Sequence, residues 1–224
     1  MLSLEPDIER SDGEANYMHI SVKMCGFIEA DSILHAVRAG VDSIGLVLDP
    51  SPRQISIAHA QSLMAVIPSH VQSVIVCGRP DLAELEEIRE RLNPDLIQLM
   101  SDALPDPSHG FEVLPAFEDG PDIVERVDAY RRRIQQPTPV ILADGPKPGS
   151  GVLADWDRIE VLGSTTRLVI AGGLTPDNVG AAIGRMRPYG VDVSSGIEVE
   201  RGVKDPDLID GFMAAVRDAE QRIN

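Results

Sequence analysis

Short apolar runs and amphipathic stretches alternate along most of this chain. Eight runs are rich in aliphatic and β-branched residues, and each is followed by a polar or Gly-rich turn. Most of these runs are continuously apolar, which is typical of strands buried on both faces. The predicted strands are residues 19–25, 42–48, 71–77, 95–100, 111–117, 138–143, 166–171 and 190–194.

Several of the helical stretches between these runs begin at recognisable capping residues. Ser56 precedes one such stretch, and Asp81 with Glu84 forms a capping box before another. Thr175 and Asp205 each stand before a proline, which favours the first position of a helix. These signals predict helices that begin at or just after the four capping positions.

The order of the elements predicts a single (β/α)₈ TIM barrel, because eight strands alternate with about seven helices. Residues 120–135 supply one helix, whereas two prolines within 101–110 leave a short or irregular helix slot after strand four. An open doubly wound sheet is the alternative, but its GxGxxG motif after the first strand is missing. The predicted barrel domain covers residues 18–224, and residues 1–17, which are polar and aperiodic, predict a flexible acidic tail.

Composition and charge argue against several classes of protein. No run approaches the roughly 18 apolar residues of a membrane span, and the N-terminus lacks a basic-then-apolar signal pattern, so we expect a cytoplasmic protein. Twenty basic against 36 acidic residues give a net charge of −16, which opposes binding to nucleic acid or to anionic membranes. The two cysteines, Cys25 and Cys77, and the scattered histidines predict neither a disulfide framework nor a metal site.

Chemically capable side chains stand at the carboxyl ends of the predicted strands, where barrel enzymes place their active sites. Cys25 ends the first strand and Asp144 the sixth, and a thiol and a carboxyl group beside glycine turns can act as an acid/base pair. Arg53 lies in a Pro-flanked loop and suits a carboxylate ligand, while Gln98 needs a partner in its buried strand. Taken singly, each also has a structural interpretation: an inert buried thiol, a turn-forming Asp, a solvated Arg or a core Gln.

Strands seven and eight both end in turns of small residues. Such turns offer free backbone N–H groups beside helix N-termini, which is how an anion is held without a basic side chain. Barrel enzymes often bind phosphate in these two turns, although the glycines could also serve only as tight turns. The predicted phosphate-binding residues are Gly172, Gly173, Ser194, Ser195 and Gly196.

Eight short motifs, in the same order along the chain, resemble the phosphoribosylanthranilate isomerase family of tryptophan biosynthesis. The resemblance runs from Val22 to about Phe212 and includes all three lysines inside or beside its motifs. The matching segments are residues 22–26, 45–53, 97–99, 142–144, 149–156, 171–179, 192–198 and 202–205.

This resemblance implies an Amadori rearrangement of N-(5-phosphoribosyl)anthranilate to 1-(2-carboxyphenylamino)-1-deoxyribulose 5-phosphate, without metal or cofactor. Asp144 matches the general acid that opens the furanose ring, and Cys25 matches the base that removes the C2′ proton. Arg53 matches the residue that binds the anthranilate carboxylate. The acid then needs a raised pKa and the thiol a lowered one. The remaining substrate-binding positions that the resemblance implies are Gln98, Gly151 and Asp192.

Three strand ends depart from the family pattern. Met100 and Ser101 stand where the family usually has His-Gly, Phe27-Ile28 replaces Thr-Arg, and Cys77 ends strand three in place of a residue such as Asn. A paralogue acting on another phosphorylated aminoaldose, or a non-catalytic phosphosugar-binding barrel, are therefore alternatives. The dual-substrate isomerases of histidine and tryptophan synthesis use aspartate where this chain has Cys25. We expect a small phosphoribosyl substrate as partner, no nucleic acid or membrane, and a monomer or homodimer.

Overall fold

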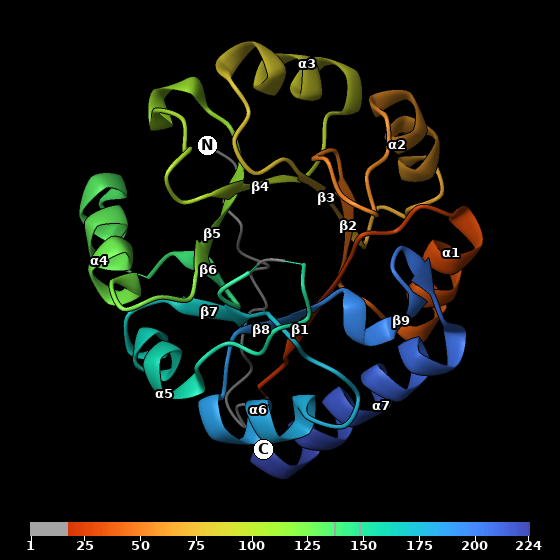
Figure 1. Ribbon diagram of the computed structural model, residues 1–224, viewed down its shortest axis with the longest axis vertical. Coiled ribbons are helices and arrows are strands. Elements are labelled where there is room, and N and C mark those ends of the chain that lie inside the picture. The colour runs from red at the N-terminus through yellow and green to blue at the C-terminus, as the bar shows by residue number, and fades with distance from the viewer. Residues whose placement is uncertain (1–17, 137, 148) are drawn as a thin grey trace, which may run out of the picture.

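Eight parallel strands close into a barrel in the computed structural model, which describes residues 18–136, 138–147 and 149–224. They follow one another in sequence order, and β1 pairs with both β2 and β8 (Figure 1). The predicted barrel is therefore confirmed, and the open sheet is wrong. The predicted tail of residues 1–17 lies outside the described residues. The strands are β1 Ser21–Cys25, β2 Ser43–Val47, β3 Gln72–Val76, β4 Leu96–Met100, β5 Val113–Glu118, β6 Val140–Asp144, β7 Arg167–Ile170 and β8 Gly190–Val193.

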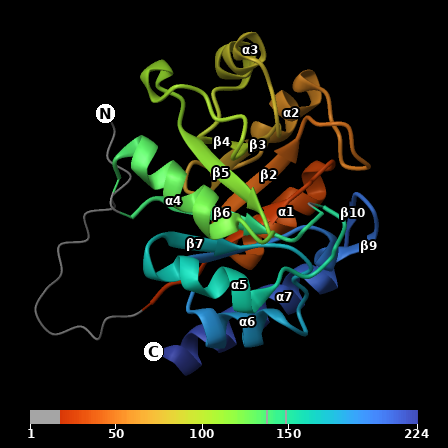
Figure 2. The ribbon, with the colours of Figure 1, turned by 60° about the vertical axis from the view of Figure 1, so that its left-hand side comes forward.

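Helices surround the barrel on the outside (Figures 1 and 2). The slot after β4 holds only the 3₁₀ turn η1, Pro107–His109, as the two prolines predicted. A short antiparallel hairpin of β9, Glu198–Glu200, and β10, Val203–Lys204, was not predicted. The remaining elements are α1 Ala30–Ala39, α2 Ile57–Met64, α3 Leu82–Leu92, α4 Ile123–Ile134, α5 Trp156–Ile159, η2 Glu160–Ser164, α6 Val179–Met186, η3 Ser195–Ile197 and α7 Pro206–Ile223.

Three of the four capping predictions are confirmed. The side chains of Ser56, Asp81 and Asp205 each accept a backbone N–H in the first turn of their helix. The prediction at Thr175 is wrong, because α6 begins only at Val179. The Thr175 N–H donates to the Asn178 side chain at 2.9 Å, so the intervening residues form a turn before the helix begins.

The two-residue period of the strands sorts their side chains between the barrel interior and the helices. A small apolar cluster of Leu114, Ala116, Leu142, Val169 and Ala171 forms one core, separate from the larger core beneath the helices. Asp144 follows Leu142 by two residues, and Cys25 follows the buried Lys23 by two. Each pair therefore shares one face of its strand. No helix among the described residues is both long and apolar enough to cross a membrane.

We predict that Phe212→Ala destabilises the fold by about 3–5 kcal/mol, because it leaves a cavity in the larger core. Phe212 is fully buried on α7, which packs beside α6 and α1 (Figure 2). Leu82→Ala is the control, since that side chain is 46% exposed, and should cost about 1 kcal/mol or less. Urea unfolding of both variants measures the difference, and equal losses would contradict this account of the core.

Candidate active site

Cys25 and Asp144 lie around one buried ion pair in the barrel interior. Lys23 Nζ donates to Asp192 Oδ1 at 2.8 Å, and both side chains are buried. Both charges act on the Cys25 thiol and also on the Asp144 carboxyl group. Lys23 and Asp192 are also register partners across the β1–β8 pairing. The fold thus brings together two groups that stand 119 residues apart (144 minus 25) in the chain.

The environment of Asp144 favours its protonated form. Burial, followed by the negative charge of Asp192, raises the pKa of Asp144 to about 6. Glu118, its register partner on β5, adds to the rise, whereas a hydrogen bond from Gly145 N at 2.7 Å opposes it. A carboxyl group with this pKa can donate a proton close to neutral pH.

Burial raises the pKa of the Cys25 thiol, so the group is a neutral thiol in the free protein. Lys23 and Lys204 oppose this rise, and Asp192 adds to it. The resemblance implied a lowered pKa, which the protein alone does not provide. Burial raises the pKa of Cys77 to about 12, so this second thiol is unreactive by the same criterion.

Arg53 lies against the end of β1 and is not a solvated loop residue. Gly26 has φ +83°, and a Cβ placed on it would lie 2.3 Å from Arg53 Cδ. Only glycine therefore leaves room for Arg53 at this position. The guanidinium is buried and donates to both carboxylate oxygens of Glu198, each at 2.7 Å. Sequence reasoning gave Glu198 no role, although it ends one of the motifs of the family resemblance.

The small residues predicted to bind phosphate, together with Gly151, lie close together. A Cβ on Gly173 would lie 2.8 Å from Gly151 O, and one on Gly151 would lie 3.1 Å from Ser195 Oγ. A Cβ on Gly196 would lie 1.9 Å from Leu174 O. The loops after β6, β7 and β8 therefore pack through backbone atoms, which requires glycine at these positions.

The other two predicted phosphate residues lie beside Asp144 and the backbone of Cys25. Gly172 lies beside Asp144, since a Cβ on it would lie 3.2 Å from Asp144 Oδ1. Ser194 Oγ donates to the Cys25 carbonyl at 2.9 Å, so this side chain connects β8 to β1. A phosphate contact at Ser194 would consequently have to come from its backbone.

Gln98 presents an unused acceptor in the barrel interior. The side chain is buried, and its Oε1 atom has no hydrogen-bond partner among the described residues. An unsatisfied buried acceptor costs about 1–3 kcal/mol, which a ligand N–H or O–H can offset. Met100, where the resemblance expects histidine, packs against the interior apolar cluster. The departure from the family thus replaces a polar side chain with core packing.

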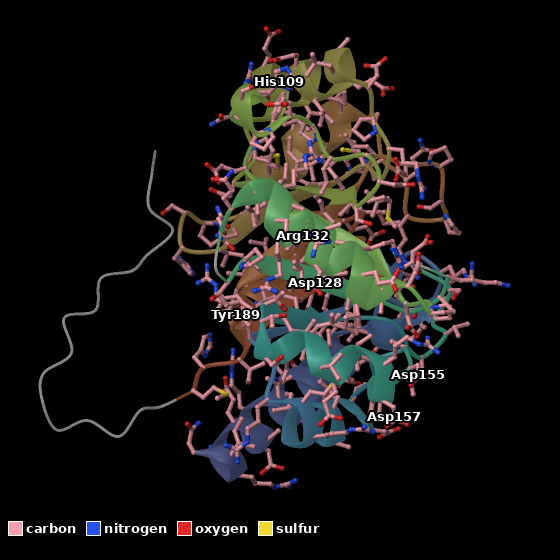
Figure 3. The ribbon with its side chains drawn as sticks, turned by 90° about the vertical axis from the view of Figure 1, so that its left-hand side faces the viewer. His109, Asp128, Arg132, Asp155, Asp157 and Tyr189 are labelled. Carbon is pink, nitrogen blue, oxygen red and sulfur yellow. The ribbon has the colours of Figure 1, made fainter. Side chains whose placement is uncertain are left out.

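Cys25 and Asp144 lie at the C-terminal end of the barrel, where β1 and β6 end. A cavity of about 470 Å³ opens at the other, N-terminal end, where Tyr189 and Arg167 contribute to its wall. Figure 3 shows the two ends apart: Tyr189 lies at the left, and Asp155, from the loop after β6, lies at the right. Lys23 lines this cavity, but the predicted acid, base and phosphate residues do not. Among the described residues no group of three His, Cys, Asp or Glu could hold a metal.

Comparison with known proteins places these residues in one family. The sequence model of N-(5′-phosphoribosyl)anthranilate (PRA) isomerase matches residues 22–215. The enzyme of that name from Pseudomonas fluorescens Pf-5 is 38% identical over 203 residues, covering 87% of this chain and 94% of the relative. The one from Streptococcus pneumoniae Taiwan19F-14 is 36% identical over 199 residues, covering 88% and 95%.

Solved structures agree with these sequence matches. Phosphoribosylanthranilate isomerase from Thermotoga maritima, in complex with reduced 1-(o-carboxyphenylamino)-1-deoxyribulose 5-phosphate, superposes with a TM-score of 0.77 at 29% identity, covering 89% of this chain and all of that one. The Thermococcus kodakaraensis enzyme gives 0.72 at 32% identity, covering 89% and 99%. Another Thermotoga maritima structure is described as monomers of a dimeric enzyme.

We predict that Asp144→Asn stabilises the fold at pH 7.5 relative to the wild type, and that this gain disappears toward pH 4. The folded pKa of about 6 lies above the ordinary 3.8, so the folded state keeps its proton longer than the unfolded state. Wild-type stability is therefore lost as pH rises from about 4 to 6, by about 3 kcal/mol at most. Urea unfolding of both proteins across this range tests it, and a constant difference would contradict the buried-acid assignment.

Proposed function

Because this chain belongs to the N-(5′-phosphoribosyl)anthranilate isomerase family, we propose that Cys25 and Asp144 act as the base and the acid of its reaction. The protein is an isomerase of tryptophan biosynthesis that converts N-(5′-phosphoribosyl)anthranilate to the carboxyphenylamino-deoxyribulose phosphate. Family membership favours this reaction over the two alternatives that the sequence left open. The observation that supports the catalytic roles best is the single Lys23–Asp192 ion pair shared by the two groups.

The proposed reaction begins with Asp144 in its protonated form. Asp144 donates its proton to the furanose ring oxygen while the C1′–O bond breaks, and the anilino nitrogen forms a Schiff base with C1′. Cys25 releases its own proton to solvent, and the resulting thiolate takes the C2′ proton, giving an enolamine. Asp144 regains a proton from solvent. The enolamine tautomerises to the ketone as C1′ gains a proton and the C2′ hydroxyl loses one. Protons balance over the cycle, and the product is an isomer of the substrate.

The first step also explains how a buried, neutral thiol becomes a base. Ring opening leaves a positive charge on the Schiff base, whose C1′ atom is bonded to the carbon from which Cys25 removes a proton. An adjacent cation lowers the pKa of a thiol, and Lys23 and Lys204 already act in that direction. The thiolate is thus favoured when the C2′ proton must leave.

The two anionic groups of the substrate are bound by different residues in this proposal. Arg53 binds the anthranilate carboxylate, and the turns at 172–173 and 194–196 bind the phosphate through backbone N–H groups. Gln98 Oε1 would accept a hydrogen bond from a substrate N–H or O–H, and Gly151 and Asp192 are the remaining proposed substrate-binding positions. We also propose that the protein acts in the cytoplasm, as a monomer or a homodimer. Size-exclusion chromatography distinguishes these two oligomeric states.

We predict that Cys25→Ser and Asp144→Asn each lower kcat by about 10²–10⁴, the contribution of a general acid or base. Loss of anthranilate fluorescence follows turnover, and calorimetry should show that both variants still bind the reduced product analogue within a few fold of wild type. Cys77→Ser is the control and should keep wild-type rates. Turnover within tenfold of wild type in either catalytic variant would refute its role, and neither variant should relieve a tryptophan auxotroph.

We predict that Gly173→Ala raises KM and the inhibition constant of inorganic phosphate at least about tenfold, with a smaller effect on kcat. Gly173 has φ +66°, and a Cβ there would lie 2.8 Å from Gly151 O, so the substitution must move the turn. Gly184→Ala on α6 is the matched control, because a Cβ there meets no atom within 4 Å. Unchanged phosphate inhibition in Gly173→Ala would place the anion elsewhere.

A further inference from the structure

Besides the Lys23–Asp192 pair, the site contains a second buried pair of charged residues, Glu198 and Lys204. This pair holds the Arg53 side chain in place and is here called the Glu198–Lys204 bracket. Arg53 Nε and Nη2 donate to Glu198 Oε1 and Oε2, each at 2.7 Å. Lys204 Nζ donates to the same Glu198 Oε1, also at 2.7 Å. The side chains of Arg53, Glu198 and Lys204 are only 5%, 2% and 1% exposed. These contacts form a buried ionic network, not a surface ion pair.

Lys204 fixes the bracket to the catalytic strand. Besides Glu198, its ammonium group donates to the carbonyl oxygens of Cys25 at 2.6 Å and Ser194 at 3.0 Å. The three strong contacts match the three N–H donors of a lysine. Its Nζ atom also lies 5.5 Å from the ring centre of Phe27, one of the departures from the family pattern. The position of Glu198 is therefore determined relative to the end of β1.

The hairpin that sequence reasoning missed supplies both members of the bracket. Glu198 begins β9 and Lys204 ends β10, and the two residues are register partners across the pair. The register of this hairpin thus sets the distance between the carboxylate and the ammonium group. The hairpin positions charged side chains behind Arg53 and adds no strand to the barrel.

The network leaves part of Arg53 available. A guanidinium has five N–H donors, and Glu198 uses the edge formed by Nε and Nη2. Nη1 makes one long contact, to Gly149 O at 3.3 Å, so the outer edge formed by Nη1 and Nη2 keeps donors that no other described residue accepts from. Two cations and one anion also leave one positive charge uncompensated within the bracket and Arg53, which favours a further anion.

We propose that the Glu198–Lys204 bracket positions the outer edge of Arg53 toward the substrate carboxylate and so sets the preference for carboxylated anilino substrates. Glu198 and Lys204 act through Arg53 and are positioning residues. This inference rests on the proposed function, because it takes Arg53 as the residue that binds the carboxylate. The opposite arrangement, in which the carboxylate displaces Glu198, would leave that buried Glu198 with Lys204 as its one cation among the residues the structure describes.

The test compares two substrates, N-(5′-phosphoribosyl)anthranilate and its analogue without the carboxylate, N-(5′-phosphoribosyl)aniline. In Glu198→Gln we expect the preference for the carboxylated substrate, measured as the ratio of kcat/KM values, to fall at least about tenfold. The fall should come mainly from KM of the carboxylated substrate, with the aniline analogue changed less than about threefold. Glu200→Gln, an exposed glutamate on the same strand, is the matched control and should keep the wild-type ratio.

Two further measurements keep the result decisive. Glu198→Asp keeps the charge and should retain more of the preference than Glu198→Gln, which a purely structural role would not require. Binding of the reduced product analogue, with and without its carboxylate, gives the same ratio by calorimetry without turnover. Equal losses on both substrates, or a rise in the preference, would overturn the inference. A wild-type protein without turnover would overturn the proposed function instead, while the binding ratio would still test the bracket.

Discussion

The ion pair between Lys23 and Asp192 is the interaction on which the site depends. It lies inside the barrel, and a buried charge is costly unless it is paired, so each of these residues requires the other. It also joins β1 to β8, the first and last strands of the barrel. The same contact that satisfies two buried charges where the barrel closes therefore fixes the strand that carries Cys25 relative to β8, the strand that leads into the turn at 194–196.

The pair has unequal effects on the two catalytic candidates. The charge of Asp192 raises the pKa of Asp144, while that of Lys23 opposes the rise that burial causes in the pKa of Cys25. An acid needs to keep its proton until the substrate arrives, and a base needs to ionise once it has. One neutral pair can serve both needs, because the charge of Asp192 has the larger effect on Asp144 and the charge of Lys23 has the larger effect on Cys25.

Local patterns in the sequence predicted the parts of the structure that depend on local rules. Continuous apolar runs identified all eight barrel strands, and the capping box at Asp81 and Glu84 located α3. The prediction at Thr175 failed in the position of the helix start: the Asn178 side chain accepts the Thr175 N–H as in a capping box, but residues 176–178 form a turn and α6 begins at Val179. The hairpin at β9 and β10 is too short for periodicity, and Val199 within it is exposed. The sequence could therefore identify individual residues at the strand ends. It could not predict the bracket of Glu198 and Lys204, because that contact depends on the register of the hairpin.

Local charge at the site explains how a protein of net charge −16 can bind a substrate with a phosphate and a carboxylate. Exposed charges are screened over about 8 Å at physiological salt, whereas buried charges act through a medium that screens them less. Lys23 is balanced by Asp192, but Arg53 and Lys204 share one glutamate, so an excess positive charge lies buried beside Cys25. Two of the three lysines in the whole chain are in this cluster. For a ligand at the carboxyl ends of the strands, the buried positive charge of Arg53 and Lys204 therefore acts more strongly than the screened negative charge of the protein surface.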